Sequence, residues 1–382
     1  MMKKNTTLIY IHTFLSTFIL YYICDTLFYI ERGLTTSQYI SFVSIAFLVK
    51  LIFEIPCGIL ADKYNKKILL IFSNTLFILA TIVFIFSHNY ISFAIAIILN
   101  AINTSLSSGV VNSLLYEGLE DKKLFNKSLF YNSSFYNISY MIAMILGGYI
   151  GQVFGLVYNY YFTLIPFFID YFILFMLKSS PSKPDESRNN ISILKNGLKE
   201  VFKNSYLIKI IFTSALLFSS IKLVEESHPE YSANIGIPIF IIGIYTAFIL
   251  LFCIAGNYIG SKINRKNYNF VLNINPIFSG FCILLIGLLN NYLGIFFILL
   301  IYIFSESFDN IMKFELHSNI SSKSRVTVES IYEFILGIFG FVFSIAMSIL
   351  LNFISLNYMY IILGFIVILF GILSWIIDTK KV

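Results

Sequence analysis

Long apolar stretches separated by short polar breaks run along the whole chain, and the first extends without interruption from Leu8 to Ile30. A helix that crosses a bilayer needs roughly 20 apolar residues, whereas the strands of a membrane barrel alternate apolar and polar positions. Because only helices and closed barrels satisfy their backbone groups in lipid, these unbroken stretches predict membrane-spanning helices. The breaks delimit twelve predicted spans, which cover residues 8–30, 36–60, 68–87, 91–116, 129–153, 156–177, 206–228, 236–260, 269–288, 292–313, 325–352 and 356–377.

The longest polar stretch, residues 178–205, divides the predicted spans into two sets of six. We therefore expect an all-α membrane protein with 12 transmembrane helices, made of an N-terminal bundle (1–177), a cytoplasmic linker (178–205) and a C-terminal bundle (206–382). Within the linker, residues 191–203 carry apolar side chains at helical spacing. They predict either a short amphipathic helix on the inner membrane surface or an extension of the seventh span.

Composition and charge support a membrane protein and give it an orientation. The 382 residues are 58% hydrophobic and 12% charged, whereas soluble domains are about one-quarter charged. Of the 26 lysines and arginines, 22 fall at the ends or in loops on one side of the predicted spans. Cytoplasmic loops retain positive charge, so we expect a multi-pass protein of the cell membrane with both termini in the cytoplasm. The net charge of +6 is scattered over loops and predicts no nucleic-acid surface.

The loop between the second and third predicted spans carries the most informative motif. Residues 54–67 read E-I-P-C-G-I-L-A-D-K-Y-N-K-K, and residues 115–119 after the fourth span read L-Y-E-G-L. The first motif resembles the signature loop of the major facilitator superfamily, and its E-x-P-x-G start resembles efflux-type members. The second resembles the end of span four in one branch of that family. The resemblance covers essentially the whole chain and implies two six-helix halves that rock around a midplane cavity.

The same resemblance implies a conformational gate at this loop, formed by Gly58, Asp62, Lys66, Lys67 and Glu117. Simple physical chemistry agrees with parts of it. A glycine at position 58 permits close helix approach, and Lys66 and Lys67 can either anchor at anionic headgroups or pair with an acid such as Glu117.

One feature common in antiporters of the family, the G-P-x-x-G-G motif, is incomplete, and the span-four arginine common in its proton-coupled members is absent. Span five keeps the paired glycines Gly147 and Gly148 but lacks the proline of G-P-x-x-G-G, and span four carries Asn100 and Asn103 but no arginine.

Ionisable residues inside predicted spans are the candidates for a substrate or proton cavity, since charges in lipid are costly. They are Asp25, Asp170, Glu226, Glu306 and Asp309. Spacings of three and seven residues place Glu306, Asp309 and Lys313 on one helical face. Desolvated carboxylates can exchange protons in the physiological range or bind a cation.

Helical spacing leaves a structural alternative open for some of these acids. Lys222 with Glu226, and Lys50 with Glu54, are four residues apart and predict ion pairs within a helix. The sequence offers no obvious local partner for Asp309, so we favour a functional role for Asp25 and Asp309.

These observations predict a monomeric secondary transporter of a small molecule, with protons as the coupling ion and no cofactor. We favour proton-coupled export of a lipophilic or cationic drug or metabolite. The alternatives are proton-coupled or facilitated uptake of a small nutrient and, with less support, a lipid-linked sugar flippase. The four histidines and four cysteines are dispersed and predict no metal site, and no nucleotide-binding or hydrolase motif indicates an enzyme.

Overall fold

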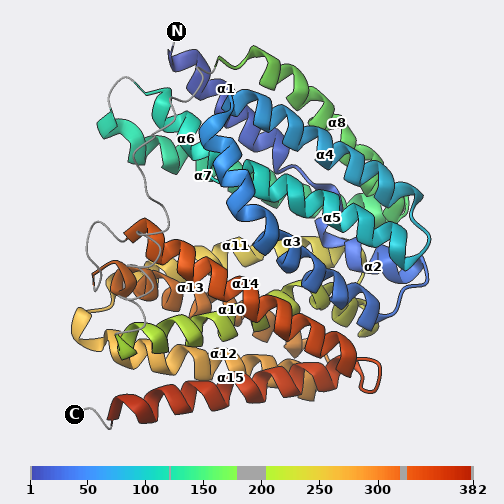
Figure 1. Cartoon of the computed structure of the whole chain (residues 1–382). Helices are drawn as coiled ribbons and strands as arrows, with labels where there is room; N and C mark the ends of the chain where they lie inside the picture. Colours follow the sequence, from blue (N-terminus) through green and yellow to red (C-terminus); the bar gives the residue numbers. More distant parts are fainter. Residues whose placement is uncertain (1, 120–121, 179–203, 319–324, 380–382) are drawn as a thin grey trace. The chain divides into compact units, whose positions relative to one another are not determined.

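The computed structural model describes residues 2–119, 122–178, 204–318 and 325–379, which are almost entirely helical (Figure 1). Each predicted span contains a helix. The long helices are α1 (Met2–Ser16), α3 (Thr36–Lys63), α4 (Lys66–Phe86), α5 (Tyr90–Ser107), α7 (Phe125–Val153), α8 (Leu156–Met176), α10 (Ser205–Asn234), α11 (Ile239–Lys262), α12 (Tyr268–Leu289), α13 (Leu293–Ser318), α14 (Arg325–Leu350) and α15 (Leu356–Thr379). The short helices are α2 (Asp25–Glu31) and α6 (Val110–Glu117), with 3-10 turns η1 (Leu20–Ile23), η2 (Lys122–Leu124) and η3 (Arg265–Asn267). Residues 179–203 of the predicted linker, with its amphipathic helix, lie outside the described residues.

Eleven segments of the described chain are long and apolar enough to cross a membrane. Helix α7, which matches the fifth predicted span, is not among them although it has 29 residues. Its first half contains asparagine, serine and lysine, and these lower its hydropathy. The total of twelve spans therefore stays a prediction.

The first span is not one continuous helix, contrary to the sequence prediction. Helix α1 ends at Ser16, and the chain continues through η1 into α2. The break is stabilised by α7 and α8. The Thr163 hydroxyl accepts a hydrogen bond from the Leu20 backbone N–H at 3.0 Å. A Cβ on Gly147 would clash with the Leu20 carbonyl oxygen, so this approach requires glycine. Hydropathy cannot detect such a break, because the broken segment stays apolar.

Contacts divide the chain into two units. Unit 1 contains α1, α2, most of α3, α4 to α8, and Ile237–Ala247, which includes the start of α11. Unit 2 contains α10, the rest of α11, α12 to α15, and Thr36–Ser44 at the start of α3. The predicted bundle boundaries remain a prediction, but α3 and α11 each contribute residues to both units.

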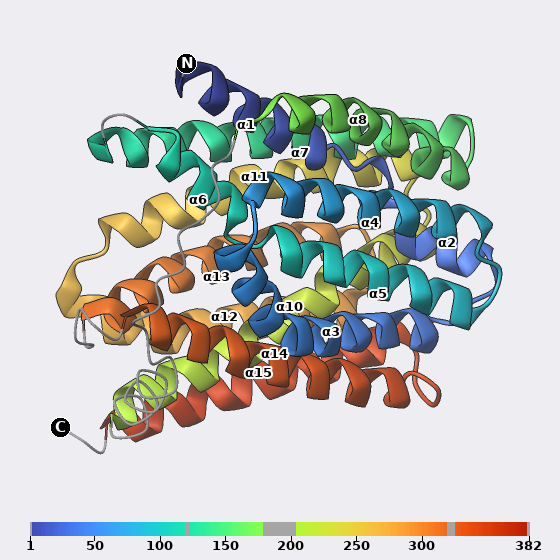
Figure 2. The ribbon, with the colours of Figure 1, turned by 45° about the horizontal axis from the view of Figure 1, so that its top comes forward.

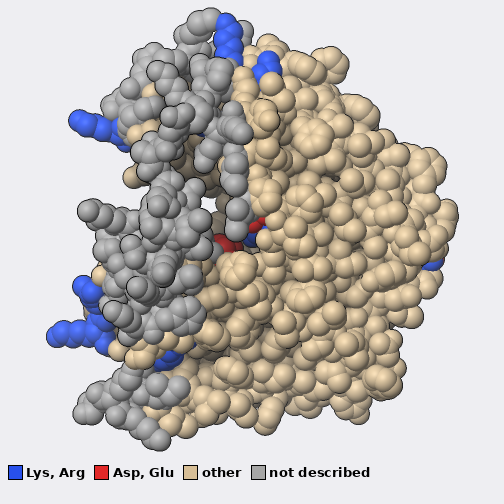
Figure 3. All heavy atoms as spheres, in the orientation of Figure 1, with Lys and Arg blue, Asp and Glu red and all other residues tan. Residues whose placement is uncertain are grey.

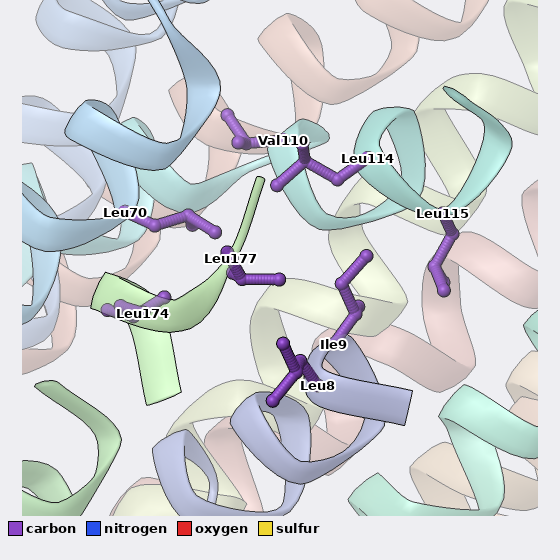
Figure 4. Packing of buried hydrophobic residues seen from close by; sticks show 8 residues of the cluster. All are labelled: Leu8, Ile9, Leu70, Val110, Leu114, Leu115, Leu174 and Leu177. Atoms are coloured by element: carbon purple, nitrogen blue, oxygen red, sulfur yellow. The ribbon is translucent and has the colours of Figure 1, made fainter. Parts of the chain in front are cut away.

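A leucine-rich cluster fills one end of unit 1 (Figure 4). Its residues come from α1, α4, α6 and the end of α8, and they are Leu8, Ile9, Leu70, Val110, Leu114, Leu115, Leu174 and Leu177. Helices α4 and α5 lie side by side (Figure 2). Between α5 and α6 the chain turns at Gly109, whose φ of +71° is unfavourable for other residues. This turn brings α6 over the ends of α1 and α4.

The start of α3 is held in unit 2 by hydrogen bonds from hydroxyl groups. Thr36 and Tyr39 donate to the two carboxylate oxygens of Glu230 on α10, at 2.8 and 2.5 Å. Ser37 and Ser348 on α14 donate to each other's backbone carbonyls at 2.7 and 2.8 Å. We call these contacts the α3 seam. It fastens nine residues of α3 to helices that follow much later in the chain.

The broad tan surface on the right of Figure 3 is almost free of charged side chains. Large apolar side chains such as Phe172 and Phe353 are exposed, at 72% and 81%. In water such a surface would be unfavourable, whereas lipid tails solvate it. The surface therefore agrees with a bilayer environment.

Helices α12 and α15 pack at very short range in unit 2. A Cβ on Gly364 would clash with the Leu284 backbone nitrogen, and one on Gly287 would clash with the Asn357 carbonyl oxygen. In a bilayer the hydrophobic effect does not drive helices together, so they associate through close van der Waals packing. Small residues such as glycine allow the two backbones to approach closely enough for this packing. Contact of α12 with α15 therefore depends on these glycines.

We predict that Gly364→Ala destabilises the protein by about 1–3 kcal/mol, because the new methyl group must displace backbone atoms. The matched control is Gly58→Ala, since nothing in the described part of its unit lies within 4 Å of a Cβ there. That variant should unfold at or slightly above the wild-type temperature, because alanine favours helix. Thermal unfolding of the detergent-purified proteins measures both, and equal midpoints for the two variants would contradict the packing argument.

Candidate functional site

A cavity of about 360 Å³ lies inside unit 1 and is lined by residues of α1 and α4 to α8. Its polar side chains recur four residues apart. Thr13 comes from α1 and Thr17 directly follows this helix, Asn103 and Ser107 come from α5, and Asn132, Tyr136 and Tyr140 come from α7. A spacing of four places side chains on one helical face, so each helix turns a polar stripe towards the cavity. The polar residues that lower the hydropathy of α7 thus include residues that line this cavity.

A buried histidine–aspartate pair lies on the wall of this cavity. His12 Nδ1 on α1 lies 2.9 Å from both carboxylate oxygens of Asp170 on α8. The two residues are 5% and 0% exposed, and both line the cavity. The amide of Asn74 on α4 donates to Asp170 at 3.1 Å and to the Phe167 carbonyl at 3.2 Å. Three helices therefore meet at one carboxylate that is removed from water.

The hydrogen bonds around the pair continue along the cavity wall. The Thr13 hydroxyl donates to Asn132 at 2.7 Å, which joins α1 to α7. The Ser73 hydroxyl donates to Asn103 at 2.5 Å, which joins α4 to α5. The Asn74 Oδ1 atom is buried and has no hydrogen-bond partner among the described residues. The two hydrogen bonds donated by the Asn74 amide nitrogen fix the orientation of the side chain, so its Oδ1 atom can still accept a hydrogen bond.

The five acids predicted for a cavity are dispersed. Among the residues lining the described cavity, Asp170 is the one predicted member. Asp25 begins α2 in the same unit, and its carboxylate accepts a hydrogen bond from the Thr26 backbone at 2.6 Å. The other three lie in unit 2, and they are Glu226, Glu306 and Asp309.

The acids of unit 2 have close partners. Lys222 lies 2.9 Å from Glu226, which confirms the predicted pair within a helix. Asp309 lies 2.7 Å from Lys313, so the interpretation that it lacks a local partner was wrong. The lysine is one helical turn later, and the pair neutralises both charges where lipid or a dry interior would penalise them. Glu306 accepts a hydrogen bond from Asn257 at 2.8 Å.

The predicted gate loop is described in part. Lys66 forms the expected ion pair with Glu117, which joins the start of α4 to the end of α6. Lys67 donates to the Phe175 carbonyl near the end of α8 at 2.5 Å. Gly58 has open space around it in the described part of its unit, so the close helix approach expected there is absent. The side chain of Asp62 lies outside the described residues, and its role in a gate stays a prediction.

Sequence analysis missed His12 as a site residue. It appeared only as one of four dispersed histidines, because 158 residues separate it from Asp170. The polar residues at His12, Thr13, Ser16 and Thr17 in an apolar span were the available signal, since they mark one face of α1.

The chain has helices long and apolar enough to cross a membrane, and several of them line a polar cavity with the buried His12–Asp170 pair. These features are typical of a multi-pass membrane protein of the transporter class. The chain belongs to the Major Facilitator Superfamily, because that family's model matches residues 6–312. A relative from Bacillus subtilis (strain 168), the uncharacterized MFS-type transporter YxaM, is 25% identical over 220 residues. That match covers 53% of this chain and 54% of the relative, so it spans about half of each.

Solved structures share the fold at low identity. A mutant of the nucleoside transporter NupG has a TM-score of 0.79 at 13% identity, and the match covers 97% of this chain and 98% of that one. A POT family transporter in complex with a thioalcohol conjugated peptide has a TM-score of 0.78 at 12% identity, over 98% and 96%. A bacterial homologue of the human lysosomal transporter Spinster, solved inward-facing, has a TM-score of 0.74 at 11% identity, over 98% and 94%. At these identities the likeness shows the fold alone.

We predict that Lys66→Glu and Glu117→Lys each lower thermal stability, because each places two like charges at a contact between α4 and α6. The exchanged double variant should recover most of the loss, with a coupling energy of about 1 kcal/mol, since Glu117 is partly exposed. Unfolding midpoints of the purified single and double variants measure the coupling. Additive losses in the double variant would show that the pair contributes nothing.

Proposed function

We propose that this protein is a proton-coupled secondary transporter that carries a small molecule across the membrane by alternating access. The observation that supports this best is the His12–Asp170 pair, buried on the wall of a polar cavity in unit 1. Ionisable groups inside membrane helices are costly, and they mark substrate pathways and proton relays. The pair is thus the proposed proton site, and the cavity contributes to the substrate site.

Proton binding at this site changes the cavity wall. While Asp170 is ionised, its carboxylate accepts hydrogen bonds from His12 and Asn74. Protonation removes the negative charge that orients both side chains, and both line the cavity. A solute in contact with them then binds with different free energies to the two protonation states. Such a difference is what links a proton gradient to transport.

We propose export as the direction. The E-x-P-x-G segment that begins at Glu54 and the L-Y-E-G-L segment that contains Glu117 resemble efflux permeases. The acids in the spans led the sequence analysis to favour a lipophilic or cationic cargo. Uptake of a small nutrient is the second candidate, because the same proton site serves both directions and the structural neighbours include nucleoside and peptide transporters. A lipid-linked sugar flippase has less support, since it does not account for the loop from Gly58 to Lys67.

We further propose that the α3 seam is an outer gate. With both termini in the cytoplasm, Thr36 begins the second span at the outer side. The later part of α3 belongs to unit 1, whereas the seam fastens its start to α10 and α14 in unit 2. Opening of the outer side by rocking of two halves would have to break these hydrogen bonds. The seam would then form and break once in every transport cycle.

We predict that Asp170→Asn loses proton-driven accumulation by at least about 10-fold while solute exchange without a gradient stays within about 2-fold. The variant keeps the shape of the side chain but cannot bind and release the proton. Everted vesicles with an acidic lumen measure export, and right-side-out vesicles with an acidic exterior measure uptake. Their cargo panel consists of a fluorescent lipophilic cation and radiolabelled neutral solutes.

His12→Gln should show the same loss, and His88→Gln is its matched control because His88 contacts Arg32 on the exposed surface of unit 1. An uncoupler should abolish accumulation by the wild type. Full accumulation by Asp170→Asn at normal membrane abundance would exclude the pair from coupling. Accumulation in right-side-out vesicles alone would replace export by uptake.

We predict that Ser37→Cys with Ser348→Cys forms a disulfide that stops transport, because the two hydroxyl oxygens lie 3.4 Å apart in the α3 seam. The background carries alanine in place of the four native cysteines. Oxidation should reduce transport by at least about 10-fold, and a reductant should restore it. Each single cysteine variant serves as the control. Unchanged transport by the fully cross-linked protein would show that the seam is a permanent contact and no gate.

A further inference from the structure

The lining of the cavity in unit 1 indicates which solutes it accepts. Neutral hydrogen-bonding groups dominate it, with four asparagines among them, namely Asn74, Asn103, Asn112 and Asn132. Among its described lining residues, His12 and Asp170 are the only acidic or basic side chains apart from tyrosines. Amide and hydroxyl groups can both donate and accept hydrogen bonds. The wall thus offers many directional contacts and few charges.

The His12–Asp170 pair is the one acid–base pair of the described lining, and it already has hydrogen-bond partners within the protein. Asp170 accepts hydrogen bonds from His12 and from Asn74, and its side chain is fully buried. A cationic solute would have to compete with these partners for the carboxylate, and separation of a buried pair costs several kcal/mol. Two of the acids that suggested a cationic cargo are paired with lysines in unit 2, where Asp309 contacts Lys313 and Glu226 contacts Lys222, while Glu306 bonds the neutral amide of Asn257 and does not line this cavity. The described cavity therefore favours no ion.

Aromatic rings also line the same cavity. Phe77 and Phe167 stack on each other with their ring centroids 3.8 Å apart and are almost fully buried, so they form a rigid part of the wall. Tyr136 and Tyr140 stack on α7 with centroids 6.5 Å apart, and the exposed ring of Tyr136 gives the cavity a flat apolar surface. Rings of a base or a sugar pack on such faces, while their substituents reach the surrounding hydrogen-bonding groups. The volume of about 360 Å³ lies near the lower end for small-molecule sites.

We infer that the cargo is a neutral, ring-containing solute rich in hydroxyl or amide groups and no larger than about a nucleoside. The inference rests on the proposed transport function and specifies its substrate class. Hydrogen bonds to the asparagines and hydroxyls would select the solute, and the His12–Asp170 pair would bind the proton and act on the solute through the orientation of Asn74. Substrate recognition and proton coupling would thus depend on different residues of one cavity.

Matched pairs of probes that differ only in charge test this inference on the purified protein. The pairs are uridine with uridine 5′-monophosphate, and methyl glucoside with methyl glucuronide, with tetraphenylphosphonium as the lipophilic cation. Binding is measured by thermal stabilisation and by equilibrium binding of labelled probe. At least one neutral member should bind, and its charged counterpart and the cation should bind at least about 10-fold more weakly. Preferred binding of a charged probe or the cation, or failure of both neutral probes, would overturn the inference.

Two variants separate recognition from coupling. Asn132→Leu should lower affinity for the neutral probe at least about 10-fold, because it removes hydrogen-bonding groups from the wall at similar volume. The matched control is Asn275→Leu on α12, where the asparagine bonds Ser307 in unit 2 and does not line the cavity. Asp170→Asn should bind the neutral probe with an affinity that no longer changes with pH, and it should lose proton-driven accumulation. Equal affinity loss in both asparagine variants would reveal a general folding effect and contradict recognition by Asn132.

The outcomes for substrate class and for transport function are distinguishable. Binding of a neutral probe without gradient-driven movement in either vesicle orientation would keep the substrate class and refute proton-coupled transport. Gradient-driven movement of the lipophilic cation alone would keep the transport function and refute the neutral cargo.

Discussion

A charge inside a bilayer must find its partner within the protein, and this constraint organises unit 1. Asp170 is fully buried on α8, and its carboxylate draws His12 from α1 and Asn74 from α4 to hydrogen-bond distance. These residues come from three spans, so the helices cannot shift independently without exposing an unpaired carboxylate to an apolar interior. Breaking such a pair is far more costly than breaking one at a surface. The carboxylate thus ties α1, α4 and α8 together at the cavity wall.

Two neighbouring glycines on α7, Gly147 and Gly148, allow this helix to pack closely against two other segments of unit 1. Gly147 leaves room for the Leu20 carbonyl and so permits the break in the first span. A Cβ on Gly148 would meet the Ile239 carbonyl oxygen at 2.9 Å and Gly243 on α11 at 3.1 Å. Successive residues of a helix point in different directions, so α7 can approach η1 and α11 at the same time. The retained glycine pair therefore has a packing reason that does not require the missing proline.

The features that could be predicted from the sequence are those determined by short-range patterns, namely the helices and the ion pairs. Every predicted span contains a helix, and the Lys66–Glu117 and Lys222–Glu226 pairs formed as expected. The sequence also selected Asp170, because one acid in an apolar span is conspicuous. What it missed depends on distant parts of the chain or on backbone contacts. His12 acquires its meaning from a residue on another helix, and the break after Ser16 depends on Gly147 and Thr163.

One local signal was misjudged. The spacing between Asp309 and Lys313 is that of an intrahelical ion pair, and the structure contains this pair. The same rule had been applied correctly to Lys222 and Glu226. Helical spacing therefore distinguishes Asp309, which has a lysine four residues later, from Asp25, Asp170 and Glu306, which have no base four residues away.

The polar first half of α7 lowers the hydropathy of this helix and also supplies side chains that line the cavity. A helix whose first half is too polar to be stable in lipid must have protein or water around its polar face. Asn132, Tyr136 and Tyr140 lie on that face and line the cavity, and Asn132 accepts a hydrogen bond from Thr13, the neighbour of His12. A solute that contacts Asn132 would therefore lie one hydrogen bond away from the residue next to His12. If the His12–Asp170 pair is the proton site, as we propose, this proximity would let substrate and proton each change the binding of the other.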